Sequence, residues 1–599
     1  MRKNLKSMAA LCMTCGLVMT QMTGCGGQSG AANASEAAAQ ETTEAADKST
    51  ETVQNESKAS IEDVTKGITE AGTVTVTLGE DGDKSVTYEP EDLDASWDAQ
   101  KATGIVLAES GITVDGDGAH VDGNTVVIEK AGTYVVSGAL ADGQVRIEAA
   151  EDELVHLVLN GAELSNKTTS SIYSPEKCKV VLILEEGTKN IIGDAGEYQF
   201  AEGEDEPDAT IFTKGDLTIN GTGELEVNGT YACAIRSKDD LKVVSGVVTL
   251  NAADDALKGK DSVVIGGGEL NITAGGDGIK SNNDEDLDKG YVWIDGGSIM
   301  IAAESDGIQA EHALVINNGS IEISKSEEAF EGKSVDILGG LIKAVSTDDG
   351  INSAGPAETE MEKMQDQDGV YTRIAGGEIW LNASADGIDS NGDLYIEGGE
   401  LYLSTPVNGD TAIIDYNGTS RITGGTVVAA GSTMMMQYFG EESTQNYLVN
   451  YYDETQKGGT EIQLTDADGR VIVSYAPEYD FAAVIISSPE LEKDSAYKIV
   501  TGETSADVTI SDIMTEVGER RGGMGGPRGM GGPGGHGGGR GQRPGEGGFP
   551  GGERPEGMEG LERGERPEGR GRDLGGMRPG APGSAETETT AEAETTAAE

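Results

Sequence analysis

Aromatic residues, basic residues and cysteine are all scarce in this chain of 599 residues. Phe, Trp and Tyr together make up 4% of the sequence, and only 43 Lys and Arg accompany 106 Asp and Glu, which leaves a formal net charge of −63. This acidic balance argues against nucleic acid as a partner and favours solubility. It also means that carboxylates on a compact fold repel one another unless cations screen or bridge them.

The five cysteines are too few for a disulfide-dense scaffold. Cys12 and Cys15 lie in the N-terminal apolar run, and we interpret Cys178 and Cys233 as small core residues. The four histidines show no convergent spacing that would indicate a catalytic or metal centre. Both observations argue against thiol or imidazole chemistry and leave the carboxylates as the candidate functional groups.

No apolar run is long enough for an ordinary membrane span. The run Ala9–Gln21 follows a basic start and is short for a transmembrane helix, as in a signal peptide. The segment Met22-Thr23-Gly24-Cys25 resembles a bacterial lipobox, in which the cysteine becomes the lipidated first residue of the mature protein. We therefore predict a signal peptide at 1–24 and a lipid anchor on Cys25, which places the exported protein on the outer face of the cell membrane. An ordinary secretory signal is the alternative.

Composition also separates two flanking segments from the fold-forming part. Residues 25–70 are dominated by Ala, Glu, Thr and Ser, which predicts a disordered tether. Residues 517–599 turn into Gly-, Pro-, Arg- and Met-rich low complexity followed by an acidic end. Arg-Gly segments occur in RNA-binding proteins, but for an exported protein a spacer or a contact with the cell wall is the better interpretation.

A block of about 22 residues repeats through the middle of the chain and closes on Asp-Gly-Ile or a variant of it. The acidic residues of the block lie 22, 29, 22, 21 and 37 residues apart, so two of the intervals contain a loop insertion. Their positions are Asp255, Asp277, Asp306, Glu328, Asp349 and Asp386. A unit this short must stack on its neighbours, which predicts a solenoid.

Each block carries three short apolar segments and no helical periodicity. Val, Ile and Leu alternate with other residues on both sides of a Gly-Gly corner, and a third apolar position follows each acidic residue by two. This pattern predicts an all-β fold, a parallel β-helix over 205–432. We expect N-terminal β coils or a cap at 71–204 and a C-terminal β cap at 433–516, because open solenoid ends pair with other chains unless they are covered.

Three segments of this region resemble a known family. They are Phe212–Gly221, Ser237–Leu241 and Gly276–Asp286, and they are similar to the clostridial carbohydrate-binding domain-containing lipoproteins. The resemblance covers roughly residues 130–515 and implies a right-handed parallel β-helix, like that of polysaccharide lyases. It also implies binding of calcium and of acidic or cellulosic plant polysaccharides. Catalysis is not an established property of this family.

Carboxylates of successive blocks should lie about 4.8 Å apart along the stack. Like charges so close either raise one another's pKa or recruit a cation, and hard oxygen ligands without His or Cys favour Ca²⁺. The alternative is a solvated acidic corner in which Asp is chosen for turn geometry. The candidate Ca²⁺ ligands are Asp254, Asp255, Asp277, Asp284, Asp286, Asp288, Asp306 and Asp349.

Aromatic and Arg side chains occupy outward positions late in the stack. Trp380 and Tyr402 share one column, and Arg373, Tyr395 and Arg421 share the next. Flat rings stack on sugar faces and Arg pairs with uronate carboxylates, so we predict a strip that binds a linear polysaccharide. The alternative is a surface ladder of aromatic cross-strand neighbours.

Arg236, Lys258 and Lys280 form a short basic column three residues beyond the acidic column. These side chains could hold polygalacturonate beside calcium, or they could neutralise the neighbouring Asp residues. A calcium-dependent polysaccharide lyase would need such a base, and Lys258, Lys280 or Arg373 could serve. The regularity of the column argues against a catalytic centre.

We therefore predict a non-catalytic, monomeric carbohydrate-binding lipoprotein of the cell surface, stabilised by Ca²⁺. A pectate-type lyase is the first alternative, and a structural or adhesive rod is the second.

Overall fold

The computed structural model describes residues 60–520 apart from 79–81, 201–202, 204, 357–358, 360, 362–363 and 409–410. The predicted signal peptide 1–24, the lipidation site Cys25, most of the predicted tether and residues 521–599 of the predicted tail lie outside the described residues. In the part of the chain that is described, no helix has the length and apolar character needed to cross a membrane.

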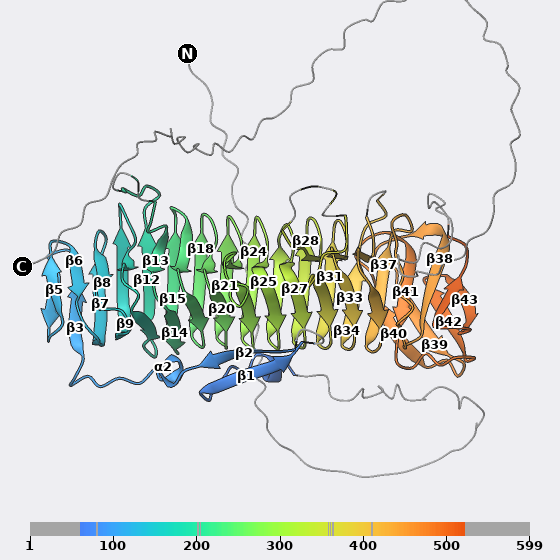
Figure 1. Cartoon of the computed structure of the whole chain (residues 1–599), viewed down its shortest axis with the longest axis horizontal. Helices are drawn as coiled ribbons and strands as arrows, with labels where there is room; N and C mark the ends of the chain where they lie inside the picture. The colour runs from blue at the N-terminus through green and yellow to red at the C-terminus, as the bar shows by residue number, and fades with distance from the viewer. Residues whose placement is uncertain are drawn as a thin grey trace, which may run out of the picture. The chain divides into compact units, whose positions relative to one another are not determined.

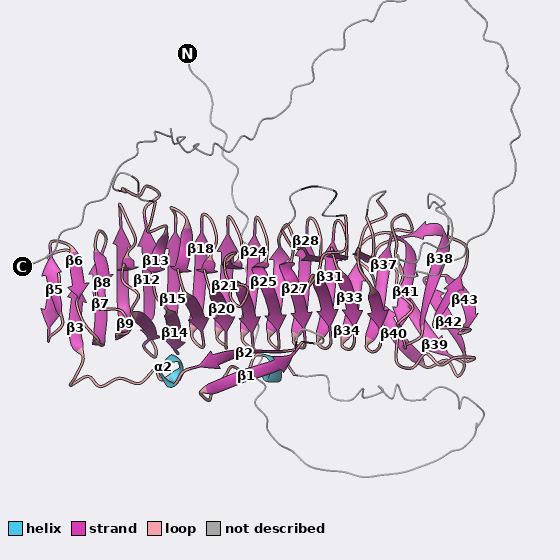
Figure 2. Cartoon of the chain, in the orientation of Figure 1, coloured by secondary structure: helices cyan, strands magenta, loops and turns pink. Residues whose placement is uncertain are grey.

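Nearly all regular structure is β-strand (Figure 2). Two single-turn helices, α1 (Ile61–Val64) and α2 (Pro90–Leu93), are the helices found in the described residues. Thirty-eight strands belong to one large sheet, in which most neighbours pair in parallel. The prediction of an all-β fold is confirmed.

Most strands of this sheet belong to three ladders, and each strand typically pairs with the equivalent strand of the next repeat. The first ladder contains β13 (Ala209–Thr213), β16 (Cys233–Ser237), β19 (Leu257–Gly259), β22 (Ile279–Ser281), the start of β25 (Ile308–Ile316), the start of β27 (Phe330–Ile337), β29 (Ile351–Ser353), β32 (Ile388–Ser390) and β35 (Asp415–Tyr416). The second contains β11 (Lys179–Leu184), β14 (Leu217–Gly221), β17 (Asp240–Val243), β20 (Ser262–Ile265), β23 (Tyr291–Ile294), the ends of β25 and β27, β30 (Tyr371–Ile374), β33 (Asp393–Ile396) and β36 (Ser420–Ile422). The third contains β12 (Lys189–Asp194), β15 (Glu224–Gly229), β18 (Val247–Ala252), β21 (Glu269–Ala274), β24 (Ser298–Ala303), β26 (Ser320–Lys325), β28 (Leu341–Ser346), β31 (Glu378–Ala383), β34 (Glu400–Ser404) and β37 (Thr426–Gly431).

The alternation of apolar residues explains these ladders. Leu250, Ile272 and Ile301 are register neighbours on the third ladder, and each is almost fully buried. Side chains of a strand alternate between its two faces, so the Val, Ile and Leu of every strand form one continuous core. Equivalent residues of successive repeats are therefore spatial neighbours, as the 22-residue period predicts.

The corner between the second and third ladders depends on glycine. The second glycine of the Gly-Gly pairs has a φ of 94° at Gly268 and Gly297 and 95° at Gly340. This left-handed region is unfavourable for residues with a Cβ. The predicted sharp corners are confirmed at these positions.

Both ends of the large sheet contain antiparallel pairs, so the sheet is mixed. At the N-terminal end β3 (Thr103–Leu107) pairs with β4 (Thr113–Asp115), and β5 (Ala119–Asp122) pairs with β6 (Thr125–Ile128). Parallel strands then follow: β7 (Gly132–Leu140), β8 (Gln144–Ile147), β9 (Leu154–Asn166) and β10 (Ile172–Ser174).

At the C-terminal end β41 (Phe481–Ser487) lies antiparallel between β37 and β38 (Tyr447–Gln456), and β38 also pairs with β44 (Met514–Val517). A separate four-stranded antiparallel sheet packs here (Figure 1). It consists of β39 (Ile462–Asp466), β40 (Val471–Tyr475), β42 (Ala496–Thr501) and β43 (Thr504–Thr509).

The first described segment differs from the sequence expectation. We call residues 60–93 the strap; it contains α1, the antiparallel pair β1 (Gly72–Thr77) and β2 (Asp83–Tyr88), and α2. Figure 1 shows β1 and β2 lying along the side of the ladders rather than at the N-terminal end of the stack. Residues 60–70 were expected in the tether and 71–93 in an N-terminal cap, but the described residues of the strap, which exclude 79–81, lie on the outer face of the second ladder.

Apolar and polar contacts hold the strap in place. Val86 and Tyr88 of β2 pack with Val264, Trp293 and Val315 of the second ladder, all nearly fully buried. The hydroxyl of Tyr88 donates a hydrogen bond to Asp295 over 2.8 Å. Those three ladder residues point outward from the solenoid core, so the strap provides them with a second, separate core.

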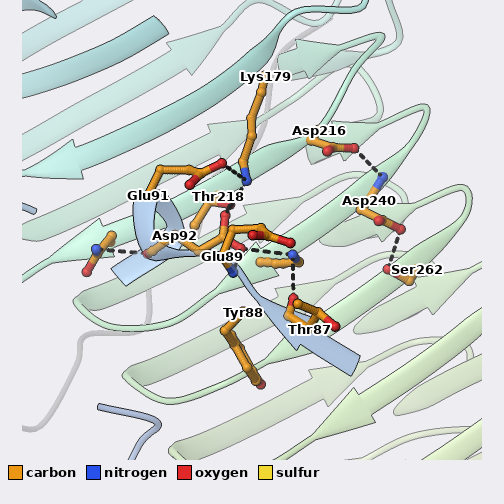
Figure 3. Close-up of polar contacts among 12 residues, drawn as sticks. Thr87, Tyr88, Glu89, Glu91, Asp92, Lys179, Asp216, Thr218, Asp240 and Ser262 are labelled. Carbon is orange, nitrogen blue, oxygen red and sulfur yellow. Dashed lines mark hydrogen bonds and ion pairs between the residues drawn. The ribbon is translucent and has the colours of Figure 1, made fainter. Parts of the chain in front are cut away.

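A buried carboxylate fixes α2 to the ladder. Asp92 has no exposed surface, and its oxygens lie 2.8 Å from Lys179 Nζ and 2.9 Å from Lys242 Nζ. Thr218 donates a further hydrogen bond over 2.8 Å (Figure 3). A buried charge with these three partners is compensated on all sides.

Candidate functional site

The acidic column of the repeat connects each block to the next. The backbone N–H of Asp277 donates to Asp255 Oδ1, and that of Asp306 donates to Asp277 Oδ1, both over 2.9 Å. The same bond recurs from Glu328 to Asp306 and from Asp386 to Asp349. The predicted column thus forms. Asp255, Asp277, Asp306 and Asp349 each use one carboxylate oxygen to satisfy the N–H of the following corner.

The basic column neutralises the beginning of the acidic column. Lys258 Nζ lies 2.6 Å from Asp255 Oδ2, and Lys280 forms the same ion pair with Asp277. Burial raises the pKa of Asp255, but Lys258 outweighs it and the pKa lies below its ordinary value. Arg236 forms an ion pair with Asp208. Of the two interpretations of this column, the ion pairs match charge neutralisation.

Bases are missing from the same column beyond Lys280, where Gln309, Glu331, Asn352 and Asp389 follow in register. Burial, followed by the interaction with Glu328, raises the pKa of Asp306 to about 7. Burial and the hydrogen bond with Asp306 likewise raise the pKa of Glu331 to about 7.

Further along the stack, the acids show the same effect. Burial is the main cause that raises the pKa values of Asp349, Asp386 and Asp389 to about 7, and neighbouring carboxylates add to it. Protons or bound cations would therefore stabilise the carboxylates in the second half of the column.

A hollow of about 520 Å³ opens on this second half; we call it the acidic pocket. Its lining consists of Glu331, Asn352, Ala354, Gly355, Met364, Asp389, Asn391, Asp415 and Asn417. Three carboxylates and three side-chain amides give it a set of hard oxygen ligands of the kind that suits Ca²⁺. Sequence analysis missed Glu331, Asp389 and Asp415, although the end of the basic column was a usable signal for them.

The insertion after Asn283 has a different geometry. Asp284, Asp286 and Asp288 are exposed. Asn283 Oδ1 accepts the N–H groups of Glu285 and Asp286, and Asp286 Oδ1 accepts that of Asp288 over 3.1 Å. These bonds are typical of turns in which Asp and Asn are chosen for their side-chain oxygen.

One group of possible metal ligands lies close together among the described residues. Ligand atoms of Cys233, Asp254 and Asp255 are all within 4.8 Å of one another. Burial raises the pKa of the Cys233 thiol to about 12, and Asp255 is already paired with Lys258. A protonated thiol suits neither calcium nor a softer metal, so this group fits an ion poorly.

The predicted aromatic pair is present, but its rings face each other. Trp380 and Tyr402 are stacked, with ring centroids 5.5 Å apart and planes at 17°. Lys343, the register neighbour of Trp380 on the preceding strand, places Nζ 5.3 Å from the Trp380 centroid. Tyr402 also contacts Tyr475 of the C-terminal sheet. Outward, the pair presents ring edges rather than open ring faces.

The neighbouring column is engaged in ion pairs. Arg373 donates to Glu397 over 2.7 Å and to the carbonyl of Thr77 in the strap over 3.2 Å. Arg421 pairs with the same Glu397, and its guanidinium carbon lies 4.0 Å from the centroid of the Tyr395 ring. Arg373 is therefore not a free fork on an open strip, because Glu397 and the strap engage its Nε and one of its two terminal nitrogens.

Comparison with known proteins shows which proteins this chain is similar to. Residues 122–409 match the family model described as carbohydrate-binding domain-containing protein. A protein of that description from Acetivibrio thermocellus is 38% identical over 150 residues, which is 25% of this chain and 52% of the relative. The chain thus spans about half the length of this curated relative. A solved structure of a polysaccharide lyase-like protein from C. thermocellum, in a gadolinium derivative, shares 37% identity over 37% of this chain and 91% of that chain, with a TM-score of 0.36.

Proposed function

We propose that this protein is a non-catalytic carbohydrate-binding protein of the bacterial cell surface. The observation that carries the proposal is the match of residues 122–409 to a carbohydrate-binding family, which supports a polysaccharide partner. The ladders supply a suitable scaffold, since equivalent residues of successive repeats line up in the way that a repeating polymer requires. We further propose that the three ladders form a right-handed parallel β-helix.

The outer face of the third ladder is our candidate for the polymer surface. It presents Met300, Glu322 and Lys343 before Trp380 and ends where the C-terminal sheet meets Tyr402. Polymer contact there would use the ring edges and the Lys343 ammonium, because the ring faces are covered. The second ladder is less suited to this role since the strap covers its outer face.

Calcium is part of the proposal. The ligands proposed from sequence include Asp277, Asp306 and Asp349, and the acidic pocket adds Glu331, Asp389 and Asp415. Of the sequence set, Asp255 and Asp277 already have lysine partners. We therefore place the main calcium-binding capacity at the acidic pocket, where a bound divalent cation would offset repulsion between carboxylates.

A lyase reaction receives less support from the contacts. Lys258 and Lys280 hold ion pairs with Asp255 and Asp277, and Arg373 with Glu397. A general base must give up such a partner and reach the substrate proton. We also propose that the protein is exported and monomeric, with a lipid anchor on Cys25; loss of palmitate labelling in Cys25→Ser would support the anchor.

The test combines affinity electrophoresis on polygalacturonate, pull-down on cellulose, and ultraviolet absorbance that reports unsaturated lyase products. We expect retention without product. The double variant Trp380→Ala/Tyr402→Ala should weaken retention several-fold, whereas Val106→Ala, at an exposed position of β3 outside the third ladder, should change it little. Product formation would favour a lyase, and neither retention nor product would favour a structural rod.

A further inference from the structure

The antiparallel pair β1–β2 of the strap, which we call the strap hairpin, is held differently at its two ends. Gly72 and Tyr88 form its base, and Thr77 lies at its tip. From the base the chain continues into α2, where Asp92 is bound by two lysines and a threonine (Figure 3). Tyr88 adds its hydrogen bond to Asp295 at the same end. The base is therefore fixed by buried polar contacts.

The tip has a weaker polar contact with the second ladder. Arg373 Nη1 donates to the carbonyl of Thr77 over 3.2 Å, and the same nitrogen lies 3.5 Å from Asp336 Oδ1. Asp336 has no exposed surface, and it also accepts a hydrogen bond from Tyr371 over 2.8 Å. Arg373 is in turn shared with Glu397. The tip thus meets the ladder beside a buried carboxylate whose arginine has other partners.

Packing beneath the strap hairpin is incomplete. A cavity of about 230 Å³ lies between β2 and the second ladder, and its lining includes Lys84, Ser85, Trp293, His312 and Val315. Nε1 of Trp293 and Nε2 of His312 are buried without a hydrogen-bond partner among the described residues. Buried polar groups without partners destabilise the closed state, and they gain hydrogen bonds to water when it opens. The apolar contacts of the strap hairpin are therefore opposed by uncompensated polar groups.

Asp336 makes this balance depend on pH. Among the described residues, the charged and titratable groups that face it are Tyr371 and Arg373 on β30, Lys84 on β2 and, through Arg373, Glu397. Burial raises the pKa of Asp336 from 3.8 to about 6, although Tyr371, Arg373 and Lys84 lower it. A pKa that is higher in the closed state than in the open state favours closure at low pH. This advantage is lost as the pH rises through the closed-state pKa.

We propose that the strap hairpin is a pH-sensitive flap, hinged at its base, whose tip lifts from the second ladder as Asp336 ionises. At acidic pH the strap hairpin covers Trp293 and Val315, and at alkaline pH it opens more often and admits water to this face. The inference goes beyond the proposed function, because the strap lies outside the residues 122–409 that match the family model.

Hydrogen–deuterium exchange of the full chain measures the opening, after correction for the intrinsic pH dependence of exchange. A two-stranded hairpin is at best marginally stable alone, so the amides of β1 and β2 exchange when the strap hairpin lifts. We expect their protection to fall about tenfold between pH 5 and pH 8, as the two pKa values of Asp336 require. The protection of the ladder strands β20 and β21 should change less.

Asp336→Asn keeps this side chain neutral at every pH, so the protection of β1 and β2 should lose its pH dependence. Asp115→Asn, at an exposed position of β4, is the matched control and should behave like the wild type. If Asp336→Asn does not fold, the wild-type pH series still decides, and a second readout supports it. In the Trp97→Phe/Trp380→Phe background Trp293 is the remaining tryptophan, and its quenching by acrylamide should increase with pH.

Protection of β1 and β2 that is independent of pH, or that falls equally in Asp336→Asn, would overturn the proposal. A fall that is only as large as that of β20 and β21 would do the same, because the whole fold would then be opening. Loss of protection on acidification would also overturn it, since that direction is expected if protonation of His312 opened the strap hairpin. The polysaccharide assays address other residues, so the two proposals can fail separately.

Discussion

Single residues at equivalent positions of the repeat have different electrostatic roles. Asp277 and Asp306 both accept a backbone N–H from the next corner. Lys280 neutralises Asp277, whereas Gln309 occupies the register position that would place a base beside Asp306. The acid therefore accepts the same backbone hydrogen bond in both repeats. The residue three positions later determines whether a lysine neutralises its charge.

The first prediction follows from this difference. Gln309→Lys should stabilise the protein at pH 8 by about 1 kcal/mol, because the new ammonium would lie in register with Lys280 and close to the acids that now have raised pKa values. Denaturant unfolding measures the gain. Gln100→Lys, at an exposed position, is the control and should have almost no effect. At pH 5 the gain should shrink, since Asp306 and Glu331 are then largely protonated; a gain that is independent of pH would contradict the argument.

The second prediction concerns Asp92. Asp92→Asn should destabilise the protein by about 3–5 kcal/mol at pH 7, because it leaves Lys179 and Lys242 partly buried without their common anion. Burial raises the pKa of Asp92, but the two lysines and Thr218 outweigh it and the pKa lies below its ordinary value.

A lowered pKa stabilises the fold above the pKa of the unfolded state, and this contribution is lost as the pH falls through the folded pKa. The difference between wild type and Asp92→Asn should therefore shrink at acidic pH. Asp98→Asn removes an exposed ion pair with Lys101 and should change stability by less than about 1 kcal/mol. Equal effects at Asp92 and Asp98 would show that the buried network does not anchor the strap.

Among the elements, the strap decides which faces of the ladders are open. Without it, Val264, Trp293 and Val315 would form an apolar patch on the second ladder. The strap also occupies a donor of Arg373. Its presence leaves the outer faces of the first and third ladders as candidates for binding a polymer.

The third prediction tests this role. Val86→Asp places a charge in the interface between strap and ladder, where Val86 is 3% exposed. We expect faster proteolysis within residues 72–88 and a red shift of Trp293 emission in the Trp97→Phe/Trp380→Phe background, because water reaches the ladder face. Val106→Asp is the control, since Val106 is 49% exposed. Unchanged proteolysis and emission would mean that the strap does not depend on this contact.

Among the described residues, unequal compensation of charge along the stack is the main electrostatic feature. Lysines neutralise the acids of the earlier blocks, while five acids further along have pKa values raised to about 7: Asp306, Glu331, Asp349, Asp386 and Asp389. A folded-state pKa above the unfolded value gives a contribution that is present at low pH and is lost as the pH rises through the folded pKa.

The fourth prediction is a pH effect on the melting temperature. Between about pH 4 and 7 these acids should lower stability as the pH rises, and calcium at pH 8 should restore part of the loss. Calorimetry of the whole chain with and without chelator measures both effects. Glu331→Gln with Asp389→Asn should flatten the pH dependence and reduce the calcium effect. Asp122→Asn with Glu176→Gln removes two exposed acids and should change neither.

The sequence by itself determined the period, the strand alternation and the columns. These features are local and repeated, so alternation around Ile272 or Ile379 indicates the same buried face in every block. The acidic column and the residues that precede and follow it could be read from spacing alone. The basic column and its end at Gln309 were visible for the same reason.

Only the tertiary structure decided how these columns are used. The strap bonds Tyr88 to Asp295 across 207 residues, and no local pattern specifies such a contact. Whether the rings of Trp380 and Tyr402 face the solvent or each other depends on side-chain torsions and on the neighbouring Lys343. Long-range packing therefore determined which faces of the ladders are open and which charges are buried, because both depend on segments that are distant in sequence.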